Sequence, residues 1–374
     1  MEEGLLRWVE VDTDQLSANA ASIVALVRPA GFMAMVKSNG YGHGLVIAAR
    51  AAVDGGATWL GVYTPQEAFA LRSAGLEVPI LVAGWSPPST YAELIARRVD
   101  VSVFDAHAVR ALAATAAAPG VRTRVHVKVD TGLHRLGVLP AETSALAAAL
   151  RAADARVEVT GIFTHFADPA ADPMFTREQH ARFLDAVEEL RQVAPGALLH
   201  TSGSASIGAH PSMHHDLVRV GIAFYGYPPV PLPASLRPAM NVFGRVAQLR
   251  TVPDGESVGY GRTWRAGGSR RIATVTIGYG QGLPRSLANR GQVAIRGVRC
   301  PIVGMVSMDQ VTVDVTDADA VKVNDVAMFI GERHGVRLGA DDVAALTGTL
   351  PHEVLCGIAA WIPRLPGSTP AALP

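Results

Sequence analysis

The sequence has few cysteines, no excess of charge of either sign and no apolar run long enough to span a bilayer. Its 374 residues include only Cys300 and Cys356, and 33 Lys and Arg residues balance 33 Asp and Glu residues. Balanced charge without long runs of one sign argues against a nucleic-acid partner or a membrane-surface patch. The start, MEEGLLRWVEVDTDQL, lacks the basic segment and apolar core of a secretion signal. We therefore expect a reduced, cytoplasmic protein that acts on a small molecule.

Apolar runs and alanine-rich segments alternate along the first part of the chain. Eight strand-like runs recur between residues 33 and 226, and most are separated by segments with apolar residues at three- and four-residue spacing. Eight such alternations within about 220 residues fit a (β/α)8 TIM barrel, which usually takes roughly 250 residues. An open doubly wound sheet is the less favoured alternative, because it needs a long mid-sheet crossover. The eight runs are MAMVK, TWLGVYT, PILVAG, DVSVFDA, RVHVKVD, VTGIFTHF, ALLHTS and LVRVGIAFYG.

A proline-rich connector, YPPVPLPASLRP, follows Gly226, and strand patterns dominate beyond it. These include NVFGRVAQLRTV, RRIATVTIGYG and DVAMFI, with one late helix near ADDVAALTGTL. A chain of this length is too long for one small core. We therefore predict an α/β protein with two domains, a (β/α)8 barrel over residues 1–230 and a mainly β C-terminal domain over 231–374. The first residues could pack with the second domain.

The stretch MAMVKSNGYGHG, from Met33 to Gly44, delivers a lysine to the end of an apolar run. With Met33, Met35 and Lys37 on one side of a strand, Lys37 is the last inward residue before the turn. A lysine held there must be paired, exposed at a mouth or chemically used. Taken alone, Lys37 is more often a salt-bridged surface residue.

The stretch RVHVKVDTGLHRLG places further polar groups at the same end of the barrel. Its valines should face the helices, which turns His126 and Lys128 into the barrel. Lys128 then needs an anionic partner or must lose its charge, whereas Arg135 is a fixed cation able to hold a carboxylate at two points. The next strand ends in Thr164 and His165.

Small residues follow the last two predicted strands. The loop SGSAS contains Ser204, and Arg219 is followed by Gly221 and Ile222. Loops at these positions of a barrel commonly cradle phosphate, because small residues let backbone N–H groups approach the oxygens. A lysine at one strand end and a phosphate site across the mouth suggest pyridoxal phosphate, held as a Schiff base and by its phosphate.

No metal site is expected. His214, His215 and Asp216 are adjacent, and adjacent residues rarely ligate one ion, so a solvated turn is the better interpretation. HEVLC, from His352 to Cys356, lacks the second histidine of a zinc helix. GYGQG, from Gly278 to Gly282, lacks the spacing of a dinucleotide loop, so a turn is expected there.

Six motifs in order resemble the alanine racemase family, whose members are fold-type III pyridoxal phosphate enzymes with a barrel and a C-terminal β domain. The resemblance runs from RWVEVD at Arg7 to PHEVLC near the C-terminus. It implies an amino-acid racemase that interconverts L- and D-alanine by a two-base mechanism, in a homodimer with shared active sites. The motifs are VKSNGYGHG, VKVDTGLHRLG, GIFTHFA, RVGIAFYG, VGYGRT and GMVSMDQ.

By this resemblance, Lys37 carries the pyridoxal 5'-phosphate and acts as one base, and Tyr260 of the partner subunit is the other. Two bases on opposite faces of the cofactor are the simplest way to invert an α-carbon. Arg219 would face the pyridine nitrogen and leave it unprotonated, which limits side reactions such as transamination. The remaining cofactor-binding residues implied are Tyr41, His165, Ser204, Gly221, Ile222 and His352.

The resemblance also implies how the substrate is held. Arg135 and the backbone of Met308 would bind its carboxylate, and Tyr279 would line the entry. Lys128 matches a lysine that the family often carries as a carbamate, which is anionic and could orient Arg135. This modification would answer the problem of a lysine inside the barrel.

Four positions depart from the family's usual pattern, and His352 bears most on selectivity. It stands where the family usually has a tyrosine near the phosphate and the substrate pocket, so serine or another small amino acid is the alternative substrate. Two different functions also fit a barrel of this kind, a pyridoxal phosphate decarboxylase or aldolase and a catalytically silent cofactor carrier; neither needs Tyr260. The remaining departures are Gly203 for asparagine, Val220 for proline and Gln281 for aspartate.

Overall fold

The computed structural model describes residues 4–116 and 122–367, and the chain forms two compact units. The first, here called the barrel unit, comprises Leu16–Gly40 and Ala48–Arg237. The second, here called the β unit, comprises Met1–Gln15, Tyr41–Ile47 and Pro238–Pro374. None of the helices within the two described ranges has the length and hydropathy needed to cross a membrane.

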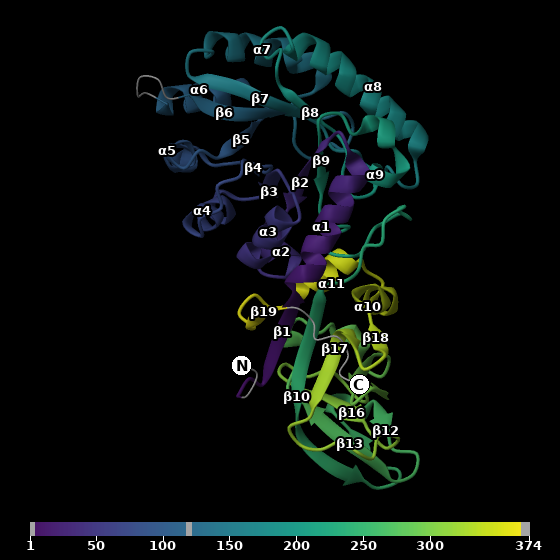
Figure 1. Cartoon of the computed structure of the whole chain (residues 1–374). Helices are drawn as coiled ribbons and strands as arrows, with labels where there is room; N and C mark the ends of the chain where they lie inside the picture. Colours follow the sequence, from purple (N-terminus) through teal and green to yellow (C-terminus); the bar gives the residue numbers. More distant parts are fainter. Residues whose placement is uncertain (1–3, 117–121, 368–374) are drawn as a thin grey trace. The chain divides into compact units, whose positions relative to one another are not determined.

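The core of the barrel unit is an eight-stranded parallel sheet in the order β8-β7-β6-β5-β4-β3-β2-β9 (Figure 1). The edge strands β8 and β9 are joined by backbone hydrogen bonds from Asp216 N to Leu199 O (3.0 Å) and from Arg219 N to Ser202 O (2.9 Å), so the sheet nearly closes. The predicted (β/α)8 barrel is confirmed. The strands are β2 (Gly31–Met35), β3 (Trp59–Val62), β4 (Ile80–Val82), β5 (Asp100–Val103), β6 (Thr123–Lys128), β7 (Val157–Phe163), β8 (Leu198–His200) and β9 (Leu217–Val220).

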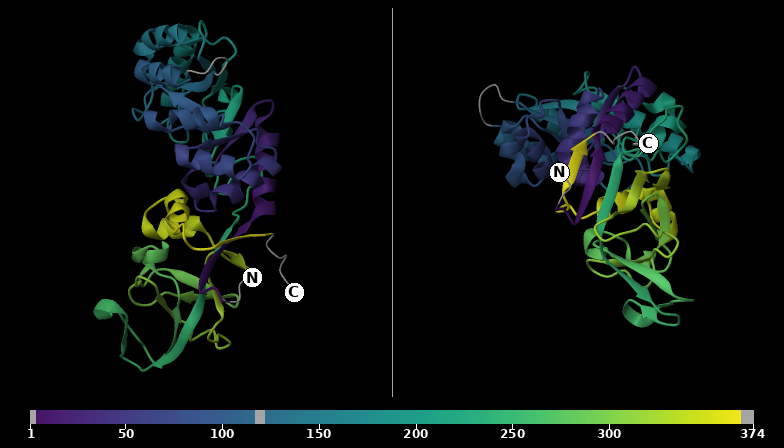
Figure 2. Two further views of the ribbon diagram at one scale, coloured as in Figure 1. Left: turned by 90° about the vertical axis from the view of Figure 1, so that its left-hand side faces the viewer. Right: turned by 60° about the horizontal axis from the view of Figure 1, so that its bottom comes forward.

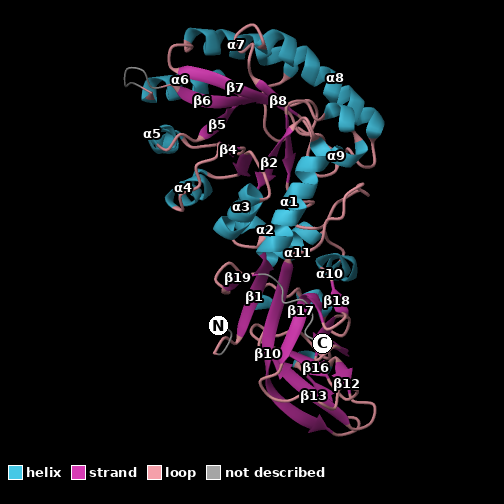
Figure 3. Cartoon of the chain, viewed as in Figure 1, coloured by secondary structure: helices cyan, strands magenta, loops and turns pink. Residues whose placement is uncertain are grey.

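Helices cover the outside of these strands, as the three views in Figures 1 and 2 and the colouring of Figure 3 show. Because both faces of the sheet are covered, β2, β3 and β4 are continuously apolar rather than alternating. Inside the barrel, Met33, Trp59, Leu81 and Leu217 form one apolar cluster. The helices are α1 (Thr13–Val27), α3 (Leu45–Asp54), α4 (Pro65–Ser73), α5 (Tyr91–Ala96), α6 (Ala106–Thr115), α7 (Thr143–Ala152), α8 (Pro173–Leu190) and α9 (Ser206–Ala209).

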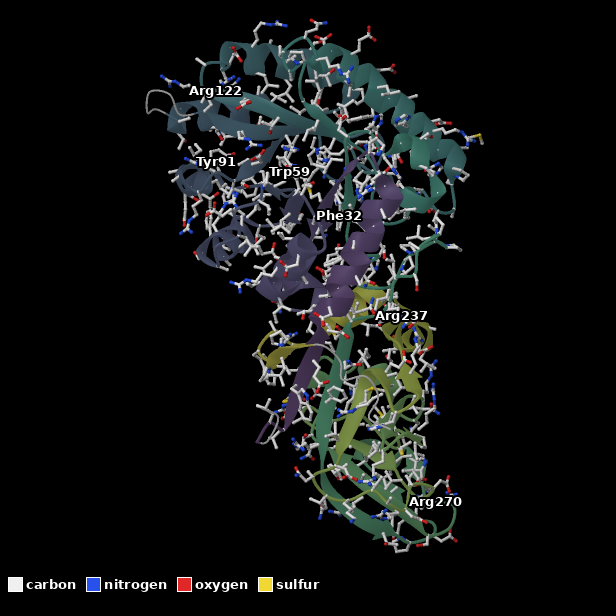
Figure 4. All side chains as sticks on the ribbon, viewed as in Figure 1. Phe32, Trp59, Tyr91, Arg122, Arg237 and Arg270 are labelled. Atoms are coloured by element: carbon white, nitrogen blue, oxygen red, sulfur yellow. The ribbon has the colours of Figure 1, made fainter. Side chains whose placement is uncertain are left out.

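Helix α1, which the sequence did not predict, is fixed to the end of the barrel unit by one buried amide. Asn19 Nδ2 donates to the carbonyls of Phe224 (2.9 Å) and Arg237 (2.8 Å), and Asn19 Oδ1 accepts from Arg237 N (3.0 Å). Figure 4 labels Arg237. A fully buried side chain thus ties the first helix to the segment that follows β9.

The β unit is built on a nine-stranded sheet whose longest strand, β10 (Met240–Val252), pairs with three others. Strand β1 (Arg7–Asp12) lies antiparallel to β10, with Arg7 opposite Gly244. Trp8 packs on Phe243 at 5.4 Å between ring centroids and forms the core with Met328 and Leu338. The other strands are β13 (Arg270–Val275), β14 (Gln292–Ile295), β15 (Val298–Pro301), β16 (Val311–Asp314), β17 (Val326–Arg333), β18 (Val336–Leu338) and β19 (Arg364–Gly367).

The smaller elements of the β unit carry several candidate residues. The predicted late helix is present as α10 (Ala340–Thr347), and a second helix, α11 (Pro351–Gly357), contains His352. A two-stranded ribbon of β11 (Ser257–Val258) and β12 (Trp264–Arg265) holds the turn that begins at Tyr260. Strand β1 and helix α11 were not predicted.

Replacing Asn19 by leucine should lower the free energy of unfolding by about 2–4 kcal/mol, because it removes three hydrogen bonds and leaves the buried carbonyl of Phe224 without this partner. Urea denaturation followed by circular dichroism measures this. Gln192→Ala, which removes an exposed amide from the same unit, should change stability by less than about 0.5 kcal/mol. Equal effects of the two substitutions would contradict the role given to Asn19.

Candidate active site

Lys37 stands immediately beyond the carboxyl end of β2, at the start of a left-handed turn. Strand β2 ends at Met35, and the residues after Lys37 have positive φ angles: 55° at Ser38, 55° at Asn39 and 61° at Gly40. Left-handed backbone costs roughly 1–2 kcal/mol for each residue other than glycine. The surroundings must therefore hold this turn in place.

Glu67 in α4 holds the turn. Its Oε1 accepts from Ser38 N at 2.6 Å, and its Oε2 accepts from Tyr63 N (3.0 Å) and Thr64 N (3.2 Å). Thr64 Oγ1 in turn accepts from Glu67 N, which completes a capping box at the start of α4. One carboxylate thus links the lysine turn to the end of β3. The half-buried Lys37 Nζ lies 5.8 Å from the centre of the Tyr63 ring.

Arg219 in β9 is buried and directs its guanidinium across the barrel. Nη1 donates to His200 O (2.7 Å) and lies 3.2 Å from His200 Nδ1. Nη2 donates to Thr164 O (2.7 Å) and Thr201 O (3.1 Å) and lies 3.2 Å from His165 Nδ1. Burial lowers the pKa of Arg219 to about 9, so it remains charged at neutral pH.

His165 serves Arg219 as an acceptor and is therefore neutral, with its proton on Nε2. Desolvation and the positive charges of Arg219 and Arg135 lower the pKa of His165. Because the side chain is exposed, the charges are the stronger reason for a neutral ring. A neutral imidazole can lie beside an aromatic cofactor without adding to the positive charge of the mouth.

Lys128, at the end of β6, points into the barrel as predicted from strand alternation. Its Nζ lies 5.6 Å from the centre of the Phe163 ring, and the residue is only 6% exposed. Burial, then the positive charges of Arg135 and Arg219, lower the pKa of Lys128 to about 8. The amine is therefore mostly charged at pH 7, but its uncharged fraction, about one-tenth, is far larger than that of an ordinary lysine.

Arg135 is exposed in the loop after β6. Asp130 organises the loop by accepting from Gly132 N and His134 N, both at 3.0 Å. Within residues 4–116 and 122–367, the Arg135 guanidinium has no hydrogen-bond or ion-pair partner. Its donors are available to a carboxylate.

The loops after β8 and β9 form a cradle of donors. Ser204 Oγ accepts from Gly221 N at 3.0 Å and from Ala223 N at 3.4 Å, and Ile222 between them is buried. A Cβ on Gly203 would meet no atom closer than 3.5 Å, so its backbone is open to a ligand. One hydroxyl and converging backbone N–H groups are the donor set that suits a phosphate. This part of the barrel therefore fits a phosphorylated cofactor.

The β unit holds the other candidates. Tyr41 is buried, its ring centre is 6.1 Å from that of His352, and burial raises its pKa, so the phenol keeps its proton. Tyr260 is 73% exposed, in a turn that follows Gly259. Tyr279 and Met308 come together, because Tyr279 N donates to Ser307 O (3.0 Å) and Gly280 N to Met308 O (2.8 Å).

His214 and His215, which the sequence places side by side, contact other residues of the barrel unit. His214 is buried, with Nε2 3.1 Å from Ile207 O, so the solvated turn expected there is wrong for this residue. His215 lies 2.8 Å from His180, nitrogen to nitrogen. Sequence reasoning missed Glu67 and His200. The TPQE run that opens α4 is the signal of a capping box and could have revealed Glu67.

Comparison with known proteins agrees over both units. The family model "Alanine racemase, N-terminal domain" matches residues 11–229, and "Alanine racemase, C-terminal domain" matches residues 239–366. An alanine racemase from Symbiobacterium thermophilum is 41% identical over 371 residues, which cover 97% of this chain and 98% of that protein.

Solved structures that resemble this chain agree with these matches. The alanine racemase from D-cycloserine-producing Streptomyces lavendulae superposes with a TM-score of 0.92 at 35% identity, over 97% of each chain. The alanine racemase from Bartonella henselae, solved with covalently bound pyridoxal phosphate, superposes with a TM-score of 0.86 at 27% identity, over 97% of this chain and 99% of that one.

Replacing Glu67 by alanine should lower the free energy of unfolding by about 1–3 kcal/mol, because three backbone N–H groups lose one shared acceptor. It should also shift the backbone amide NMR signal of Ser38. Glu93→Ala, which removes an exposed carboxylate paired with Arg97 in α5, is the matched control and should cost less than about 1 kcal/mol. An unchanged Ser38 signal in Glu67→Ala would contradict the anchoring role.

Proposed function

Because the chain belongs to the alanine racemase family, we propose that it interconverts L- and D-alanine with pyridoxal 5'-phosphate held at the barrel mouth. The observation that carries this proposal is the meeting of three groups in one barrel. They are the lysine beyond β2, the buried arginine of β9 and the donor cradle after β8 and β9.

Lys37 is the residue to which we assign the covalent attachment. Ser204 and the backbone of Gly221 and Ile222 would hold the phosphate, with further donors from Tyr41 and His352. Arg219 would face the ring nitrogen and His165 the ring. When bound, the cofactor supplies an electron-accepting ring that makes the α-C–H bond of an amino acid acidic.

Racemisation requires a proton to leave one face of the α-carbon and another to arrive at the opposite face. We assign these two tasks to Lys37 and to Tyr260 of the partner subunit. Tyr260 is far too exposed in the single chain to act in a water-excluded site. We therefore propose a homodimer in which each active site is completed by its neighbour, with Met308 contributing in the same way.

We propose that Arg135 and the backbone of Met308 bind the carboxylate of the substrate, and that Tyr279 lines its entry. The backbone bonds that join the segments of Tyr279 and Met308 support their acting together. Alanine is the substrate that the family favours. A racemase of serine or another small amino acid is the competing interpretation, because His352 is a different shape from the phenol it replaces.

We further propose that Lys128 is carbamylated. A carbamate forms when an uncharged amine attacks carbon dioxide and loses a proton, and the pKa of about 8 leaves a larger uncharged fraction of Lys128 at neutral pH than an ordinary lysine has. The product is anionic, lies in the same mouth as Arg135 and would supply that guanidinium with an acceptor. The substitution of an anion for a cation would also relieve the crowding of positive charge.

The proposed activity predicts that the cofactor-loaded enzyme in heavy water will exchange the α-proton of alanine and invert its configuration. A panel of single L-amino acids, analysed by mass spectrometry and chiral separation, measures both. Tyr260→Phe should lower the rate by at least about a hundredfold, whereas Tyr91→Phe, at a buried phenol in α5 to which no role is assigned, should not. Exchange confined to another amino acid would overturn alanine as substrate, and no exchange at all would overturn racemisation.

Mixing two inactive variants tests the shared site. Lys37→Ala and Tyr260→Phe homodimers should each be inactive, and a re-associated equimolar mixture should recover about a quarter of the wild-type activity, because half the dimers carry one intact site. No recovery in a mixture shown to contain heterodimers would contradict the contribution of Tyr260 across the interface.

The carbamate can be observed directly. In ¹³C-bicarbonate, the enzyme should show a carbamate signal by ¹³C NMR that is lost in Lys128→Arg. Because only the uncharged amine reacts, reformation of the carbamate after acid treatment should increase as pH rises through about 8 and be suppressed below it. Reformation that is insensitive to pH between 6 and 9 would contradict the assignment.

A further inference from the structure

Three polar side chains lie inside the barrel and have no role in the function proposed above. Asp100 at the start of β5, His126 in β6 and His200 at the end of β8 are each 0% exposed. The interior of such a barrel is normally filled by branched apolar residues, and burying polar groups is costly unless they are paired. Their presence therefore requires an explanation.

The three side chains form a chain of polar contacts that ends at Arg219. His126 Nδ1 lies 2.8 Å from His200 Nε2, and His200 Nδ1 lies 3.2 Å from Arg219 Nη1, both within hydrogen-bond distance. His126 Nε2 lies 3.3 Å from Asp100 Oδ2, which is an ion-pair distance without hydrogen-bond geometry. The rings are held by their neighbours. Trp59, labelled in Figure 4, packs its edge against His126, and Phe163 stacks on His200 at 4.8 Å between centroids.

The protons in this chain can be placed from chemistry alone. Arginine only donates, so His200 Nδ1 is an acceptor, and the single proton of a neutral imidazole must then be on His200 Nε2. That proton is donated to His126 Nδ1, which leaves the proton of His126 on Nε2, facing Asp100. The reverse arrangement would leave His200 with no proton on either nitrogen, so only one direction is possible.

The charges around the chain agree with this direction. Burial and the nearby His126 and Arg219 lower the pKa of His200, which keeps it neutral. At the far end, Asp100 Oδ2 also accepts from Thr160 Oγ1 at 2.9 Å and lies 3.3 Å from Arg124 Nη2. The chain thus runs from a buried carboxylate to a buried guanidinium.

We propose that Asp100, His126 and His200 are positioning residues that act through Arg219. The negative charge of Asp100 favours the proton of His126 on the nearby Nε2, His126 Nδ1 accepts the proton of His200, and His200 then presents a lone pair that holds Arg219 as a donor. The four N–H groups of Nη1 and Nη2 face five acceptors on this side, because the two of Nη2 are shared among Thr164 O, Thr201 O and His165 Nδ1. Among the residues that the structure describes, Nε–H has no acceptor, and it would be the donor for the ring nitrogen of the cofactor.

This inference rests on the proposed function for its chemical purpose, because the ring nitrogen is supplied by the cofactor. A guanidinium held as a donor keeps that nitrogen unprotonated and the cofactor a weaker electron acceptor. Loosening the chain should let the nitrogen acquire a proton. The enzyme would then convert alanine and cofactor into pyruvate and the aminated cofactor more often per racemisation event.

The first test does not depend on turnover. In the holoenzyme with ¹⁵N-labelled histidine, NMR should show both His126 and His200 protonated on Nε2 alone, with no change between pH 6 and 9. A proton on Nδ1 of His200, or a doubly protonated ring, would overturn the proposed direction. This result stands whether or not the enzyme racemises alanine, so it separates failure of the chain from failure of the proposed function.

The second test uses Asp100→Asn and His126→Phe, with Ser102→Ala as the control. Ser102 is also buried in β5, but its hydroxyl donates to Val82 O, outside the chain. Both chain variants should raise the ratio of transamination to racemisation roughly tenfold or more, about the effect of one hydrogen bond to a charged group. They should also make the visible absorption of the bound cofactor pH-dependent, with KM for alanine changed by less than about twofold.

The two chain variants separate positioning from packing. A folded variant with unchanged product ratio and unchanged spectrum would overturn the proposal. If His126→Phe does not fold, Asp100→Asn alone decides between the two roles, because asparagine keeps the shape of the aspartate side chain and removes its charge. A purely structural role would lower stability in all three variants without altering the spectrum.

Discussion

Crowding of positive charge at the carboxyl ends of the barrel strands is the constraint to which the rest of the site responds. Lys37, Lys128, Arg135 and Arg219 all come from these strand ends or the loops that follow them. Burial disfavours the charged forms of Lys128 and His165, and the neighbouring positive charges add to this, so the pKa of each is lowered. A phosphorylated cofactor and a carboxylate substrate would both bring negative charge beyond that of Glu67 and Asp130.

Much of the barrel could be predicted because its signals are local. Parallel strands converge at their carboxyl ends, so the alternation that turned His126 and Lys128 inward also placed them beside Arg219. Helix α1 and strand β1 were missed because their partners lie more than two hundred residues away: Asn19 bonds Phe224, and Arg7 faces Gly244. No local pattern identifies such a partner.

The residues of the candidate site also differ in whether a local sequence signal could place them. The residues of the barrel unit could be placed by strand ends and loop composition, and the structure brings Ser204 to Gly221 and Arg219 to His165. Only the resemblance suggested a role for Tyr260 and Met308. Both side chains are exposed in the single chain, which is why we propose that they act in the active site of a partner subunit. The proton order between Asp100 and Arg219 lay beyond sequence reasoning, since it follows from distances between four strands.

The long-range ties of the two ends have a consequence for how the protein is made. Strand β1 finds its antiparallel neighbour only when residues near 244 have been synthesised, and its parallel neighbour β19 only at residues 364–367. Helix α1 likewise can form its hydrogen bond to Arg237 only after that residue has been synthesised. Strand β1 and helix α1 are therefore among the last segments to reach their final places, and the growing chain must keep their apolar surface exposed until these partners are made.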